Sequence, residues 1–239
     1  MQNADRFNAL IMALGVFLGL TGLGWLVGNA AIDVKEYERS VTVKGLAEEE
    51  FTADVVIWPI QFTLASNDLP SLYQDIDTNT RTIITFLTDQ GIEREDMTIG
   101  TPAITDKSAQ QYGNQDRAEF RYTGMQTVTV YSEAIDTVRQ TMGKLSELGK
   151  QGIVLSGNNY QSQTEYLFTR LNEVKPAMIE DATRKAREVA QKFAQDSDSR
   201  LGKIRRASQG QFSINPRDNN TPHIKKVRVV STIEYYLSD

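Results

Sequence analysis

The chain begins with a long apolar segment. No charged residue lies between Arg6 and Asp33, and residues 7–32 read FNALIMALGVFLGLTGLGWLVGNAAI. A helix of about 20 apolar residues crosses a hydrocarbon core of roughly 30 Å, so this segment is long enough to span a membrane. We interpret residues 1–32 as a signal anchor, because the apolar run exceeds a usual signal-peptide core. A cleaved signal peptide is the alternative, since Gly28-Asn29-Ala30 offers small residues at a cleavage-like position.

Residues 33–40, DVKEYERS, are predicted to be a polar linker. Lys35, Arg39 and Lys44 follow the apolar segment, whereas only Arg6 and the terminal amine precede it. The positive-inside rule therefore does not support a cytoplasmic N-terminus. We nevertheless expect that orientation, because an N-terminal apolar helix ahead of a soluble domain usually acts as an export signal.

Three later segments carry apolar residues at helical spacing. They span residues 67–91, 135–149 and about 173–195. In the third, Asn172 is the expected cap and Pro176 is expected in the first turn, where proline is tolerated. Alanines recur in this helix at every fourth residue: Ala182, Ala186, Ala190 and Ala194. Such a row predicts close packing against a sheet or another helix.

The remaining segments with alternating or β-branched residues predict strands. They span 41–46, 51–65, 97–105, 119–131, 153–168, 201–212 and 225–237. Pro59 cannot donate to a ladder, so its strand is expected to lie at an edge or to be bulged there. Residues 107–117 and 213–221 are polar and are predicted to be loops. The order of elements predicts an α+β fold of mostly antiparallel sheets packed by three helices, over a domain of residues 41–239.

Composition excludes several kinds of chemistry. The 239 residues carry a net charge of -5, which argues against a nucleic-acid partner. The absence of cysteine excludes disulfides, thiolate nucleophiles and zinc fingers. The single histidine, His223, is expected in an exposed loop beside Pro222. No nucleophile elbow, HExxH, P-loop, GxGxxG or EF-hand pattern occurs, so we expect no enzyme activity and no catalytic, cofactor-binding or metal-binding residue.

Three charged clusters have more than one interpretation. Glu48-Glu49-Glu50 and Asp196-Ser197-Asp198 could attract a cation, but solvated surface is the better interpretation of both. Arg200, Lys203, Arg205 and Arg206 form a basic cluster. It is expected to protect an edge strand by charge, and the alternatives are an acidic partner or lipid headgroups.

Seven short segments, in order and spacing, resemble the SIMPL-domain family over roughly residues 40–237. They are Val41-Thr42-Val43-Lys44-Gly45, Ala53-Asp54-Val55, Leu87 with Gly91-Ile92, Tyr122 to Val130, the alanine row 182–194, Leu201-Gly202-Lys203-Ile204 and Val227 to Tyr236. The resemblance implies a bacterial envelope protein that faces the periplasm. Some members of this family are linked to oxidative-stress defence, and one immunogenic member forms a large hollow oligomer. The family has no established catalytic residues, so the resemblance assigns none here.

We therefore expect a non-enzymatic envelope protein that acts by self-assembly and protein interaction in oxidative or envelope stress tolerance. Its expected partners are further copies of itself, through edge strands and the loops 107–117 and 213–224, and the inner membrane, through the N-terminal helix. The expected location is the periplasm, either anchored or released after cleavage. The alternative is a small-molecule-binding module with a helix–sheet pocket lined by Tyr122, Tyr131 or Tyr160.

Overall fold

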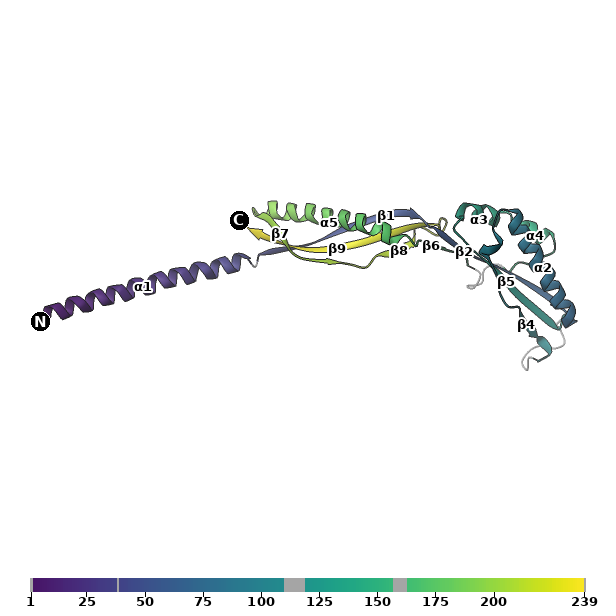
Figure 1. Ribbon diagram of the computed structural model, residues 1–239, viewed down its shortest axis with the longest axis horizontal. Coiled ribbons are helices and arrows are strands. Elements are labelled where there is room, and N and C mark those ends of the chain that lie inside the picture. The colour runs from purple at the N-terminus through teal and green to yellow at the C-terminus, as the bar shows by residue number, and fades with distance from the viewer. Residues whose placement is uncertain (1, 38, 110–118, 157–162, 239) are drawn as a thin grey trace. The chain divides into compact units, whose positions relative to one another are not determined.

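The computed structural model describes residues 2–37, 39–109, 119–156 and 163–238 (Figure 1). The chain forms two compact units. The first comprises Met1–Glu48, Lys175–Ser213 and Arg228–Asp239, and the second comprises Glu49–Val174 and Ile214–Val227. The interval 41–239, expected as one domain, therefore contributes to both units.

The first unit contains the N-terminal helix and most of a sheet, of which residues 49–52, 214–216 and 224–227 belong to the second unit. Helix α1 spans Gln2–Tyr37, so most of the segment expected to be a linker is helical. Strands β1 (Ser40–Thr52), β9 (Ile224–Ser238) and β7 (Arg200–Gln209) lie in the order β1-β9-β7, and β8 (Ser213–Pro216) also pairs with β9. We call this sheet A. The β8 segment was expected to be part of a loop and instead forms a strand.

Both outer strands of sheet A run antiparallel to β9. The Leu237 N–H donates to the Arg39 carbonyl at one end of β1, and the Ala53 N–H donates to the His223 carbonyl just beyond the other. Strand β7 pairs with β9 from Arg200↔Ser238 to Gln209↔Ser231, with two register shifts between Leu201 and Arg206. The basic cluster thus lies on an edge strand, as the sequence predicted, and the structure adds that this strand is irregular.

Helix α5 (Leu171–Asp196) covers one face of sheet A. Its four alanines are almost fully buried, and Ala186 and Ala190 form a core with Val43, Ile233 and Tyr235. The predicted close packing is therefore confirmed. The helix begins before the expected cap Asn172, so Pro176 lies inside the helix and not in its first turn.

The second unit contains an antiparallel sheet in the order β3-β5-β2-β6, with β4 also paired to β5. Its central strands β2 (Val55–Ser66) and β5 (Tyr122–Ser132) pair without a register shift from Val56↔Ser132 to Ser66↔Tyr122. Strands β3 (Met97–Ile99), β4 (Ala103–Asp106) and β6 (Glu165–Leu167) are short. The single strand expected over 97–105 is therefore two strands.

Pro59 lies in β2, which has β5 on one side and β6 on the other and pairs with β5 without a bulge, so the expectation of an edge or bulged strand is wrong. On the side of β2 away from β5, β6 pairs only with residues 55–57, and the next bond is from the Thr63 N–H to Val154. Pro59 has the same strand parity as Thr63, so its missing N–H falls between these two paired segments. Among the described residues, none pairs with this side of β2 at Pro59, so the missing N–H breaks no hydrogen bond there.

Helices α2 (Leu69–Asp89), α3 (Ile135–Met142) and α4 (Ser146–Lys150) lie on one face of this sheet, as Figure 1 shows. The helix expected over 135–149 is therefore two helices. Short 3₁₀ turns, η1 (Arg94–Asp96) and η2 (Lys107–Ala109), complete the unit. Its core joins both layers through Val56, Trp58, Phe62, Ile83 and Val128, among others.

The ends of α2 follow from local chemistry. The Asp68 carboxylate accepts the Ser71 N–H at 2.9 Å, and Pro70 occupies the first turn. At the other end Gly91 has φ of 87°, and the Ile92 N–H donates to the Leu87 carbonyl. This arrangement closes a helix with a glycine in the left-handed region. Both ends were predicted from the sequence.

Candidate functional site

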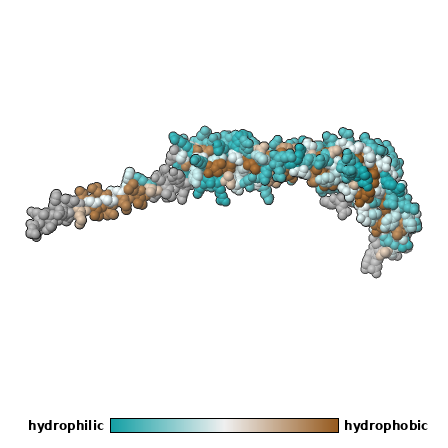
Figure 2. Space-filling view, in the orientation of Figure 1, coloured by the Kyte–Doolittle hydropathy of each residue, from teal (hydrophilic) through white to brown (hydrophobic). Residues whose placement is uncertain are grey.

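Helix α1 contains the one candidate membrane span among the described residues. The span Met12–Ala30 has 19 residues and a mean hydropathy of 1.5, and the side chains of this range are exposed (Figure 2). At 1.5 Å per residue it is about 28 Å long, close to the thickness of a hydrocarbon core. An apolar helix of this kind near the N-terminus is a signal peptide or a membrane anchor, and both are consistent with an envelope protein.

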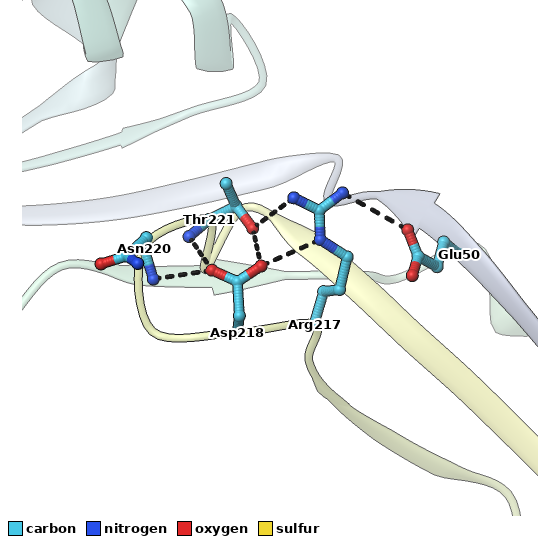
Figure 3. Close-up of polar contacts among 5 residues, drawn as sticks. All are labelled: Glu50, Arg217, Asp218, Asn220 and Thr221. Carbon is cyan, nitrogen blue, oxygen red and sulfur yellow. Dashed lines mark hydrogen bonds and ion pairs between the residues drawn. The ribbon is translucent and has the colours of Figure 1, made fainter.

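A dense polar cluster surrounds Asp218 in the second unit (Figure 3). The Asp218 carboxylate accepts the N–H groups of Asn220 and Thr221, both at 2.8 Å, the Thr221 hydroxyl, and Arg217 Nε at 2.9 Å. Arg217 also reaches Glu50 at 3.4 Å. The Thr221 hydroxyl and then Arg217 hold the pKa of Asp218 far below its ordinary value. Because the chain itself occupies both carboxylate oxygens, this cluster fixes a turn and offers little to a ligand.

Asp54 links two segments that are distant in the sequence. Its carboxylate accepts the backbone N–H groups of Thr169, at 2.9 Å, and Arg170, at 3.2 Å, immediately before α5 begins. It also accepts the Thr169 hydroxyl and Arg170 Nε. Burial alone would raise the pKa of Asp54, but these hydrogen bonds outweigh it and lower the pKa. The start of α5 is thus fixed by Asp54 and not by the expected cap Asn172.

His223 is half-buried, which corrects the expectation of an exposed loop residue. Its ring centroid lies 5.9 Å from that of Tyr166, and its pKa is lowered first by burial and then by Arg139. Burial also raises the pKa of Tyr166 and lowers that of Lys225. All three groups are shifted towards their neutral forms, which is the usual effect of desolvation.

The surface of the second unit contains two open hollows. One, of about 520 Å³, lies between α2 and α4 and is lined by polar side chains such as Thr82, Asp89 and Glu147. The other, of about 340 Å³, lies beside Tyr131 and is lined by Glu93, Asp96 and Glu133. Among the described residues, no three His, Cys, Asp or Glu side chains gather as a metal site would require.

The alternative pocket was expected to be lined by Tyr122, Tyr131 or Tyr160, and the first two of these do not lie together. Tyr122 packs against the core below α2, whereas Tyr131 is 52% exposed. Nine residues separate them on one strand, so their side chains point to opposite faces of the sheet. Tyr160 lies outside the described residues, as does most of the loop expected over 107–117.

The basic cluster on β7 has one internal partner. Arg205 forms an ion pair with Glu234 at 2.9 Å and lies 5.7 Å from the centre of the Tyr236 ring. Glu234 also accepts the Ser40 hydroxyl at 2.6 Å, and this bond contributes most to lowering its pKa. Arg200, Lys203 and Arg206 are exposed and have no ion pair within the described ranges. The pairing of Arg205 with Ser40 and Glu234 is formed by residues far apart in sequence, and no local pattern indicates it.

Comparison with known proteins places the chain in a family but gives no activity. No curated protein matches it. Residues 41–232 match the SIMPL family, described as a protein of unknown function (DUF541). This interval includes helices α2 to α5 and both sheets, except for the first residue of β1 and the last residues of β9, so the chain belongs to the SIMPL family.

Proposed function

We propose that the protein is a non-enzymatic envelope protein that is anchored in the inner membrane by α1, faces the periplasm and acts by self-assembly. The observation that supports self-assembly most directly is the outer edge of β1. In the described part of the chain, this 13-residue strand pairs with β9 alone. An unpaired edge presents backbone donors and acceptors to a further strand.

The two edges of sheet A differ in how well they are protected. Strand β7 carries four basic side chains and two register shifts, and both features hinder strand addition. Over residues 40–47, β1 carries a single charge, Lys44. We therefore assign the interface to β1, which would pair antiparallel with β1 of a second copy around a two-fold axis.

The absence of cysteine allows a direct test of this interface. Single cysteines replace each residue from Val41 to Ala47 in turn in the full chain, reconstituted in a membrane, and are oxidised. In an antiparallel pair only the residue at the two-fold axis lies directly opposite its own copy, so we expect a strong covalent dimer at one of these positions. Ala207→Cys, exposed on the β7 edge, is the matched control and should remain monomeric. A full chain that sediments in detergent as a monomer at high concentration contradicts self-assembly.

The role in stress tolerance is a separate proposal, based on the family resemblance. Without thiols, protection by this chain would be indirect or would consume its methionines and tyrosines. A deletion strain is challenged with peroxide and complemented by the full chain. Restored survival supports the role, and equal survival of the deletion and parent strains contradicts it.

Ligand binding is a second candidate, favoured by the hollow beside Tyr131. A half-exposed aromatic ring in a concave acidic surface is suited to a small cationic ligand. Thermal-shift screening of organic cations, with Tyr131→Ala as the control, tests this candidate. A shift that persists in the variant would exclude this hollow.

A further inference from the structure

Sheet A has an open face that no element described so far accounts for. Helix α5 packs against the face that carries Val43, Ile233 and Tyr235, so Thr42, Thr232 and Glu234 point to the opposite face. There, these three residues and Arg206 and Ser208 line a hollow of about 230 Å³. The hollow lies on three adjacent strands of one unit.

The side chains around this hollow form a set of donors. Arg206 lies opposite Glu234 in the register and helps to lower the pKa of that carboxyl, but among the described residues it forms no hydrogen bond and no close ion pair. The hydroxyls of Thr42, Ser208 and Thr232 have no hydrogen-bond partner there. A guanidinium group beside hydroxyl groups suits the oxygens of a phosphate. The hollow can therefore accept an anion without breaking a hydrogen bond or a close ion pair between the described residues.

The one carboxylate that lines the hollow, Glu234, does not prevent anion binding. Glu234 is neutralised by Arg205 and is also hydrogen-bonded to Ser40. Two guanidinium groups and one carboxylate leave a net positive charge, and the exposed Arg200 and Lys203 add to it along β7. The acidic residues of α5 belong to the layer on the covered face.

The covalent structure places this surface next to the membrane. The apolar span ends at Ala30, and α1 continues to Tyr37, only three residues before Ser40 begins β1. Seven helical residues extend about 10 Å, which is comparable to the thickness of one headgroup layer. Thr42 is the third residue of β1, so the hollow is at the end of sheet A that follows the span.

We propose that this open face of sheet A binds the phosphate groups of anionic lipid headgroups, with Arg206, Thr42 and Ser208 as the contacting residues and Arg200 and Lys203 as supporting charges. This inference rests on the proposed retention of α1 as an anchor. It adds a second, electrostatic contact with the membrane that depends on lipid composition.

The test uses the full chain with one fluorescent label at Ser238→Cys. Ser238 is exposed and pairs with Arg200, so the label reports on this end of sheet A. The protein is reconstituted into vesicles of phosphatidylcholine, with or without phosphatidylglycerol, that contain a lipid with a quencher on its headgroup. We expect stronger quenching with phosphatidylglycerol, reversed by high salt.

Three sets of substitutions identify the residues responsible. Removing Arg200, Lys203 and Arg206 together, each to Gln, should reduce the docking equilibrium by about fivefold per side chain. The matched control removes three exposed charges from the second unit, as Arg81→Gln, Lys107→Gln and Lys150→Gln, and should leave quenching unchanged. Thr42→Val with Ser208→Ala should weaken quenching at constant charge, which a purely diffuse attraction would not produce.

Each contrary result has a distinct meaning. Vesicle flotation measures anchoring separately. If the protein floats with neither kind of vesicle, the proposed anchor is contradicted. If it floats with both kinds and is quenched equally with and without phosphatidylglycerol, only the lipid-docking proposal is contradicted. If the variant without Arg200, Lys203 and Arg206, or the variant with Thr42→Val and Ser208→Ala, is quenched as strongly as the parent, the assignment to this hollow is overturned. A label response to inorganic phosphate in phosphatidylcholine vesicles, absent with chloride at equal ionic strength, would assign the site to free phosphate and overturn the lipid proposal.

Discussion

Gly45 is the position where the packing of the first unit can be tested most severely. It lies in β1 directly below α5, and a Cβ atom built there would meet the Ala182 carbonyl oxygen at 1.8 Å and the Ala186 nitrogen at 2.6 Å. Both neighbours are backbone atoms, so no side-chain rotation relieves the overlap. The Gly45→Ala variant therefore has to separate the helix from the strand.

The size of the effect follows from the displacement. Ordinary contact begins at 3.4 Å, so the helix must move outwards by more than an ångström. A gap of that size removes most of the dispersion contacts of the buried alanine row. Each methyl-sized group contributes about 0.8 kcal/mol when buried, so loosening four of them reduces the free energy of unfolding by about 3 kcal/mol.

The assay is urea unfolding of the full chain in detergent, followed by far-ultraviolet circular dichroism. Gly149→Ala is the control, because a Cβ at Gly149 meets nothing within 4 Å and the residue lies in α4. Alanine should stabilise that helix by about 0.5–1 kcal/mol. If the free energy of unfolding of Gly45→Ala lies within about 0.5 kcal/mol of the parent value, the reasoning is refuted, because substitutions at exposed surface positions have effects of that size.

Three further predictions concern single contacts. Tyr235 is 1% exposed, and its hydroxyl has no hydrogen-bond partner among the residues that the structure describes. Tyr235→Phe should therefore leave the free energy of unfolding unchanged or raise it by up to about 1 kcal/mol, and a clear loss would contradict this. Gly91→Ala should destabilise by about 1 kcal/mol, because φ is 87° there, and a neutral result in urea unfolding would exclude the left-handed conformation. Folding lowers the pKa of Asp54, so the stability that its charged form contributes is present above the ordinary pKa of 3.8 and is lost as pH falls through the pKa in the folded state. The loss in free energy of unfolding caused by Asp54→Asn should therefore become smaller in acid. A loss that does not depend on pH would contradict this.

Features encoded within a short stretch of sequence were predicted well. The ends of α2 depend on Asp68 and Gly91, which act on backbone groups within five residues. The alanine row of α5 repeats at the helical period, so its burial follows from one face meeting the sheet. The long strand β9 alternates buried and partly exposed residues, and its bounds differ from the expectation by one residue at each end.

Features that depend on distant contacts were not predicted. Asp54 lies 115 residues from Thr169, and nothing near either residue indicates that they meet. Tyr73 has the helical spacing of a buried residue, but it is 46% exposed because the core below α2 is filled by Leu72 and Ile76. Residues 33–37 are polar, yet they continue α1, since polarity alone does not end a helix without a glycine or proline.

The candidate site was predicted only in part. The basic residues of β7 were recognised, together with both lipid headgroups and edge protection as explanations. The sequence could not show that Arg205 forms the close ion pair with Glu234, whereas Arg206, the residue opposite Glu234 in the register, does not. This depends on the register shift between Ile204 and Arg206. The sequence also could not place the hydroxyls of Thr42 and Thr232 in the site, because they come together only through the pairing of β1 with β9.

The two proposals for the first unit are geometrically compatible. The two-fold axis that relates two antiparallel β1 strands is perpendicular to the sheet, so both copies present their open faces on the same side. Both copies of α5 then lie on the other side. A single membrane can therefore meet both phosphate-binding hollows at once, and the two α1 segments enter it from the opposite ends of the paired strands. Two weak lipid contacts on one rigid dimer bind more strongly than either alone, so disrupting the β1 interface should also weaken the lipid-dependent quenching.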